Sequence, residues 1–257
     1  MLVIRERAGQ VETLTLNRPE AANSLNPPLM AELGSALHEI LLDVDVRAVV
    51  VTGAGERVFC AGMDLTALGG FDTDPSTWDD PEGARVLFRF LDGAYEKPLI
   101  AAVNGAAVGG GLEIVMACDL VVAAEHARFG LPEVKRGLFA AGGGVFVSTR
   151  IPLAVALELT LTGDSIDAGR ALSLGLINQV VPPAEVLDAA FALAERIARN
   201  GPLALHATKQ MVRTASTDLE RAKVLAAEWQ PKVFGSEDAK EGATAFIEKR
   251  DPVWKGR

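Results

Sequence analysis

Two glutamates, Glu113 and Glu133, stand twenty positions apart in segments that are otherwise apolar. Glu113 closes the glycine-rich segment 103–113, and Glu133 closes the Phe-Gly-Leu-Pro-Glu segment 129–133. A carboxylate is costly to bury without a partner, because desolvation opposes its charge. The placement of two such groups predicts an acid/base pair.

Three consecutive glycines, Gly109-Gly110-Gly111, precede Glu113. They let backbone N–H groups approach a ligand without obstruction by a Cβ atom. The helix expected to follow turns its positive end to the same spot. Because Glu113 lies about one turn beyond Gly110, a hydrogen-bond donor and a base can serve one substrate carbonyl. The alternative is close helix–strand packing, with Glu113 as a cap or in an ion pair.

Two further segments are each ambiguous when taken alone. Glu133 follows Pro132, which suits the first helical position, so the carboxylate could simply favour the helix dipole. In the segment 57–65, small residues close on a Gly-x-Asp turn that can expose the N–H of Met63. The alternative is a tight turn in which Asp64 is a local cap.

Composition excludes several classes of partner. The net charge of −9 argues against broad binding to nucleic acid or to an anionic membrane, both of which need a basic face. The most apolar stretch, 98–124, is interrupted by polar residues and predicts buried core. Two cysteines, Cys60 and Cys118, do not make a disulfide framework and fit a reducing compartment such as the cytosol.

The sequence lacks the patterns that mark two common kinds of binding site. Gly53-Ala54-Gly55 follows a predicted strand but has Val58 where a dinucleotide-binding fingerprint needs a third glycine. The histidines stand in separate segments, and there is no Cys-x-x-Cys pair, which argues against a metal site. We therefore expect neither a metal nor a separate cofactor.

The elements that must position these residues follow from apolar patterning. Strands are expected at 2–7, 11–16, 47–52, 99–103 and 120–124, with helical segments between them, which predicts an α/β fold. The acidic stretch 69–83 is expected to be a solvated loop, either a surface connection or a lid. Helices are expected at 186–198, 202–215, 219–233 and 237–249. We predict a core of residues 1–198 and a C-terminal helical region, 199–257, whose apolar faces need a partner.

Taken together, these segments resemble the crotonase (enoyl-CoA hydratase) superfamily over the whole chain. The resemblance begins at segments 17–19 and 23–26, continues through 59–64, 103–119 and 129–133, and closes at 245–250. It implies an α/β, crotonase-like spiral of repeated ββα units with a C-terminal helical trimerisation region. The expected assembly is a homo-trimer or a dimer of trimers.

The resemblance also implies roles for single residues. The backbone N–H groups of Met63 and Gly110 would form the oxyanion hole for a thioester carbonyl, Glu113 would mainly activate water, and Glu133 would mainly deliver a proton to C2. Substrate and coenzyme A contacts are expected from Ala61, Asp64, Leu65, Arg18, Arg57, Gly109, Phe139 and Lys249, the last of these reaching a neighbouring subunit. The alternative for each of the three cations is a solvated surface position.

Some positions depart from the family pattern. Glu20 and Thr66 stand where lysines are frequent, and Ala140-Ala141 replaces a frequent Pro-Gly, so the acyl pocket near Phe139 is expected to be remodelled. The leading hypothesis is a 2-enoyl-CoA hydratase, a hydro-lyase that acts on an acyl-CoA thioester. Dehydration of carnitinyl-CoA or another hydroxyacyl-CoA is one alternative. A low-turnover acyl-CoA- or RNA-binding member is the other, although the chain has no basic stripe.

Overall fold

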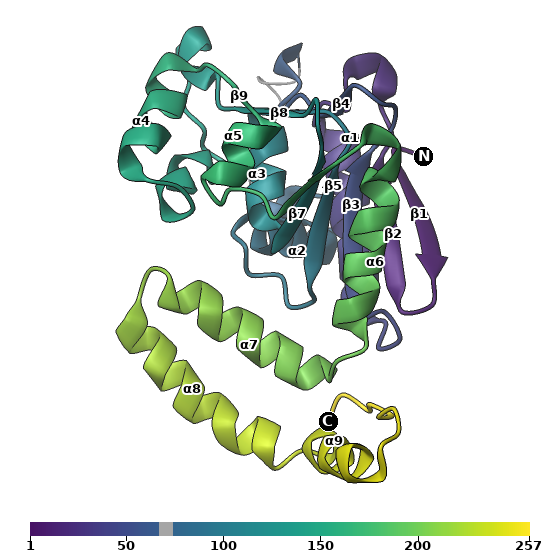
Figure 1. Ribbon diagram of the computed structural model, residues 1–257. Helices are drawn as coiled ribbons and strands as arrows, with labels where there is room; N and C mark the ends of the chain where they lie inside the picture. The colour runs from purple at the N-terminus through teal and green to yellow at the C-terminus, as the bar shows by residue number, and fades with distance from the viewer. Residues whose placement is uncertain (67–73) are drawn as a thin grey trace.

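The computed structural model describes residues 1–66 and 74–257, which form two β-sheets surrounded by helices (Figure 1). The six-stranded sheet has the order β1-β2-β3-β5-β7-β10, and the four-stranded sheet has the order β4-β6-β8-β9. The strands are β1 (Val3–Ala8), β2 (Val11–Leu16), β3 (Ala48–Gly53), β4 (Val58–Cys60), β5 (Leu99–Val103), β6 (Ala106–Val108), β7 (Leu120–Ala124), β8 (Arg128–Gly130), β9 (Ile166–Asp167) and β10 (Gln179–Val181).

Helices connect the strands and build the C-terminal region. They are α1 (Pro27–Leu42), α2 (Pro81–Leu91), α3 (Gly110–Ala117), α4 (Leu153–Thr162), α5 (Ala168–Ser173), α6 (Val186–Ala198), α7 (Pro202–Ala215), α8 (Leu219–Phe234) and α9 (Glu237–Glu248). Short 3-10 helices include η1 (Pro19–Ala21), η3 (Pro75–Thr77), η4 (Glu133–Arg136), η5 (Gly144–Thr149) and η6 (Pro183–Glu185).

The large sheet is parallel apart from its first hairpin. β1 and β2 pair antiparallel, and the pairs β2–β3, β3–β5, β5–β7 and β7–β10 are all parallel. Every residue of β3 and β5 is buried, as expected for apolar strands covered on both faces. Helix α6 packs across β2, β3, β5 and β7. The predicted α/β class is confirmed.

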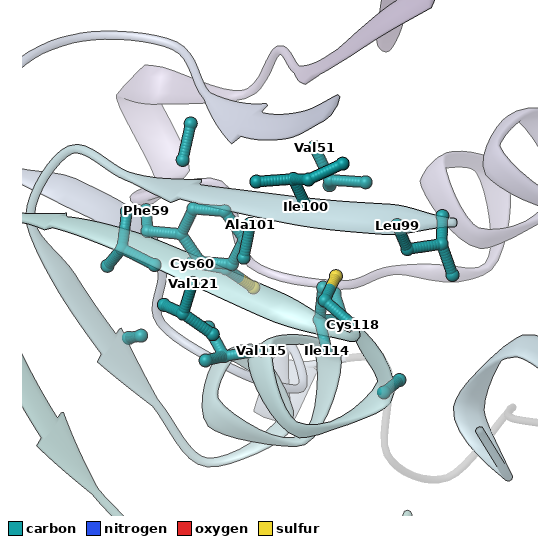
Figure 2. Packing of buried hydrophobic residues seen from close by; sticks show 14 of the residues in the cluster. Val51, Phe59, Cys60, Leu99, Ile100, Ala101, Ile114, Val115, Cys118 and Val121 are labelled. Atoms are coloured by element: carbon teal, nitrogen blue, oxygen red, sulfur yellow. The ribbon is translucent and has the colours of Figure 1, made fainter. Parts of the chain in front are cut away.

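One part of the core lies between the large sheet and α3. Figure 2 shows labelled side chains of β3, β5, β7 and α3 gathered in one cluster with Phe59 and Cys60. Cys60 and Cys118 are both buried and unbonded. Burial raises the pKa of each thiol to about 12, so both stay protonated and pack as small apolar groups.

The stretch predicted as a loop at 69–83 needs a correction at its end. Residues 69–73 lie outside the described part of the chain, but α2 already begins at Pro81. Asp80 is its N-cap, because its side chain accepts from the N–H of Gly83 at 2.9 Å. A capping aspartate followed by proline at the first helical position is a helix start signal, and the loop prediction overlooked it.

Helices α7, α8 and α9 lie together at one end of the molecule, and α7 runs beside the core (Figure 1). Large apolar side chains stay exposed there, including Phe234, Phe246 and Ile247. The division of the chain near residue 198 and the expected self-association both stay predictions. Among the helices of residues 1–66 and 74–257, none has the length and apolar character that a membrane crossing needs.

Candidate active site

Glycines allow α3 to sit close to β4, which places Glu113. Gly109 has φ of +58°, a left-handed conformation that turns the chain into α3. A Cβ atom on Gly111 would stand 2.0 Å from the carbonyl oxygen of Cys60, so only glycine permits this approach. Glu113 therefore lies in the first turn of α3, beside the end of β4.

Two backbone N–H groups lie side by side near this helix start. Leu25 forms a parallel bridge with Met63, in which the N–H of Leu25 binds the carbonyl of Gly62 and the N–H of Asp64 binds the carbonyl of Leu25, both at 2.8 Å. This pattern leaves the N–H of Met63 directed away from Leu25. Gly110 is the first residue of α3, so its N–H has no partner within the helix.

The two donors are brought together by Gly62, which has φ of +89°. A Cβ atom there would stand 2.9 Å from the nitrogen of Gly110, so a side chain would displace one donor from the other. Within residues 1–66 and 74–257, no acceptor is recorded for the N–H of Met63 or of Gly110. The arrangement can bind an oxygen atom that develops negative charge.

The carboxylate of Glu113 is held by the glycine-rich loop before η5. Its Oε1 accepts from the N–H of Gly144 at 2.9 Å. A Cβ atom on Gly142 would stand only 2.5 Å from Oε2, which shows how closely this loop wraps the group. Burial raises the pKa of Glu113, and the nearby charge of Glu133 raises it further. The ion pair suggested as an alternative for Glu113 is not found among the described residues.

Glu133 is the first residue of η4, after Pro132. Its Oε2 is buried without a hydrogen-bond partner in the described part of the chain, and its Oε1 lies 3.2 Å from the Cβ position of Gly109. Burial raises the pKa of this carboxyl as well. A buried oxygen without a partner is expensive, and a bound water or substrate would satisfy it.

Both carboxylates line one cavity of about 1300 Å³. Its lining includes most of the residues proposed from the sequence for the chemistry and for substrate contact, namely Ala61, Met63, Leu65, Gly109, Gly110, Glu113, Glu133 and Phe139. The structure thus brings together side chains and backbone donors from β4, α3, η4 and the loops around them.

The remaining proposed contacts lie outside this lining. Arg18 pairs with Asp64 at 3.2 Å and donates to the carbonyl of Ser24 at 2.6 Å. Asp64 also accepts from the hydroxyl of Thr66 at 2.7 Å, so the local capping role holds for this residue. Arg57 and Lys249 are exposed. The contacts of all four with coenzyme A stay predictions.

Two parts of the cavity were not predicted from the sequence. The first is the N–H of Gly144, which binds Glu113 from the start of the short 3-10 helix η5. The second is one face of α7, which contributes Leu205, Thr208, Lys209, Val212 and Arg213. Spacings of three and four residues mark that face as a helix stripe. Its mixture of apolar and basic residues was a signal that could have been used.

Comparison with known proteins agrees with this fold and cavity. The family model for enoyl-CoA hydratase/isomerase matches residues 6–257, and the chain belongs to that family. A short-chain-enoyl-CoA hydratase from Clostridium acetobutylicum is 41% identical over 250 residues, covering 96% of this chain and 95% of the relative. A carnitinyl-CoA dehydratase from Escherichia coli O157:H7 is 40% identical over 259 residues, covering 98% of this chain and 97% of the relative.

Solved structures show the same likeness. The enoyl-CoA hydratase from Mycobacterium tuberculosis H37Rv is 41% identical, with a TM-score of 0.88 over 100% of this chain and 99% of that one. The carnitinyl-CoA hydratase from Mycobacterium avium is 44% identical, with a TM-score of 0.74 over 100% of this chain and 99% of that one. The crotonase-like fold and an enzyme of the enoyl-CoA hydratase type are confirmed at the level of the family.

Proposed function

We propose that this protein is a 2-enoyl-CoA hydratase, which adds water reversibly across the 2,3-double bond of an acyl-CoA thioester. One observation carries the proposal. Two carboxylates with raised pKa values and two backbone N–H groups without recorded acceptors lie on the same cavity. Hydration of a conjugated thioester needs both pairs of groups.

The backbone donors stabilise the charge that develops during the reaction. Attack of water at C3 moves negative charge onto the thioester oxygen and forms an enolate. The N–H groups of Met63 and Gly110 bind that oxygen, and each such donor contributes on the order of 10²–10³ in rate. Because Gly62 and Gly109 fix the backbone on either side, the donors need no reorganisation.

The carboxyl pair moves the protons. Glu113, ionised, accepts a proton from the attacking water, whose oxygen bonds to C3. Glu133, protonated, delivers a proton to C2, and exchange through the next bound water resets the pair. Burial raises the pKa of both carboxyls, so each can hold a proton at a higher pH than an exposed glutamate does. Groups of this kind contribute roughly 10²–10⁴-fold.

We propose that the coenzyme A portion of the substrate enters past Ala61 and Leu65, with Lys249 acting from a neighbouring subunit of a trimer or dimer of trimers. The donors and the acid/base pair come from the chain itself, so the chemistry requires no cofactor beyond the coenzyme A of the substrate. The buried thiols of Cys60 and Cys118 fit a reducing compartment such as the cytoplasm.

Dehydration of a hydroxylated acyl-CoA, such as carnitinyl-CoA, is the second candidate. It runs the same steps backwards. Ala140-Ala141 favours it, because these residues precede the loop that holds Glu113 and alter the pocket near Phe139. A panel of enoyl- and hydroxyacyl-CoA substrates separates the two candidates by relative kcat/KM.

The proposal is tested by the loss of absorbance of the conjugated thioester in crotonyl-CoA. We expect Glu113→Gln and Glu133→Gln each to lower kcat by roughly 10²–10⁴-fold, with unchanged circular dichroism. Glu195→Gln, an exposed glutamate of α6, is the matched control and should retain full activity. Near-normal turnover in either active-site variant would refute the assignment.

A further inference from the structure

One face of α3 lines the cavity from the proposed chemistry to the far end. Gly110, Glu113, Met116 and Ala117 all contact it, and Asp119 follows just beyond the helix. Seven steps separate Gly110 from Ala117, so this face extends about 10.5 Å at 1.5 Å per residue. The thioester carbonyl would lie at Gly110, so the length of this face can be compared with the length of the acyl chain.

The walls around the middle of this face are apolar. Met116 of α3 shares the cavity lining with Phe88 and Leu91 of α2. From the opposite side, Leu205 and Val212 of α7 face the same space. A hydrocarbon chain that runs from Glu113 past Met116 would therefore replace water with apolar contacts along its length.

Charged groups line the cavity just beyond the last turn of α3. Asp119 pairs with Lys209 at 2.7 Å and with Arg213 at 2.8 Å, and both partners belong to α7. Arg150 donates to the carbonyl groups of Met116 and Cys118 at the end of α3. These ions lose hydration if hydrocarbon covers them, which is unfavourable. The apolar face of α3 therefore leads to the charged groups around Asp119, just beyond the last turn of the helix.

We propose that this site selects acyl groups of about eight to ten carbons, with α7 as the end wall. An extended chain advances about 1.3 Å per carbon, from C–C bonds of about 1.5 Å, so about eight carbons span the face of α3. A four-carbon chain ends before the Asp119 ion pairs, whereas a sixteen-carbon chain must pass them. This inference names the substrate class of the proposed hydratase and rests on that function for its turnover readout.

Two measurements test chain length independently. The first is kcat/KM for 2-enoyl-CoA substrates of four, ten and sixteen carbons. The second is calorimetric binding of the saturated acyl-CoAs of the same lengths, which needs no turnover. Each methylene removed from water favours binding by up to about fourfold. We expect at least a tenfold gain from four to ten carbons and no gain, or a loss, at sixteen.

A bulky substitution on α7 tests the end wall. Val212 of α7 lines the cavity and is 65% exposed, so tryptophan fits there without disturbing the core. We expect Val212→Trp to reduce the ratio of ten-carbon to four-carbon kcat/KM at least tenfold. Val224→Trp, on an exposed valine of α8 outside this lining, is the matched control and should leave the ratio unchanged.

The outcomes separate the two proposals. The chain-length inference is overturned if kcat/KM is highest for the four-carbon substrate. It is also overturned if kcat/KM and affinity continue to rise up to sixteen carbons. An unchanged ratio in Val212→Trp overturns the role of α7. If no enoyl-CoA is hydrated while saturated acyl-CoAs still bind best at ten carbons, the proposed hydratase function fails and the length selection stands.

Discussion

Substitution of one exposed glycine offers the sharpest test of how Glu113 is held. Gly142 is exposed and has no positive φ, so alanine suits its backbone. Its new Cβ atom would stand 2.5 Å from Oε2 of Glu113, whereas ordinary contact begins at 3.4 Å. The carboxylate must therefore retreat by about 0.9 Å, the difference between these distances, unless the loop itself moves.

A displacement of about 1 Å in a reacting group can cost 10²-fold in rate. We therefore expect Gly142→Ala to lower kcat/KM for an enoyl-CoA about 10²-fold, which corresponds to about 2.7 kcal/mol of transition-state stabilisation. The assay is the same absorbance loss of the conjugated thioester. The melting temperature should change little, because the clash falls on the end of a side chain and not on the backbone.

The matched control is Gly169→Ala in α5. Its nearest atom would be Oδ1 of Asp167 at 3.5 Å, an ordinary contact. Alanine inside a helix stabilises by about 0.5–1 kcal/mol relative to glycine, so this variant should be fully active and slightly more stable. Wild-type kcat/KM in Gly142→Ala would show that turnover does not depend on this placement of Glu113.

Three further outcomes follow from the same contacts. Burial raises the pKa of Glu113 above 4.5, and the proposed base must be ionised. We therefore expect kcat/KM to fall as the pH decreases, with an apparent pKa above 4.5 for the acidic limb of the pH–rate profile. An apparent pKa at or below 4.5 would contradict this. A raised carboxyl pKa contributes stability below the unfolded pKa that is lost as pH rises through the folded pKa, so the melting temperature of Glu113→Gln relative to wild type should rise from pH 4 to pH 7; a constant difference would oppose it. Asn23 is fully buried, donates to the carbonyl groups of Ala54 and Val58 at 3.0 Å and accepts from the N–H of Arg18 at 3.0 Å. Asn23→Ala should therefore lower the free energy of unfolding, measured in urea, by about 3 kcal/mol. The exposed Asn200→Ala is the control and should lower it by less than about 0.5 kcal/mol.

The sequence was most informative where one pattern persisted over several residues. Strands β5 and β7 occur at the predicted bounds, because continuous buried runs of branched and small apolar residues leave little choice of structure. Helices α6 and α7 also match, since their apolar periodicity is long and Pro202 is the first residue of α7. Local apolar patterns were therefore sufficient to predict most strands of the large sheet and the C-terminal helices.

Short elements and contacts between distant residues could not be predicted from local sequence patterns. The small sheet was missed because β4, β6 and β8 have three residues each, too few to show alternation. The contact between Gly144 and Glu113 joins positions thirty-one residues apart through a loop. The wall formed by α7 depends on its ion pairs with Asp119, which only the folded chain brings together.

The single helix α3 separates two properties that many enzymes mix. Its first turn carries Gly110 and Glu113, which in the proposed mechanism align the reacting atoms, and its last turn carries Met116 and leads to Asp119, which in the proposed chain-length selection limit the acyl tail. Substitutions at the far end can retune which thioester is preferred while the catalytic turn keeps its frame. Related enzymes built in this way can change their acyl-chain specificity while keeping the same catalytic mechanism.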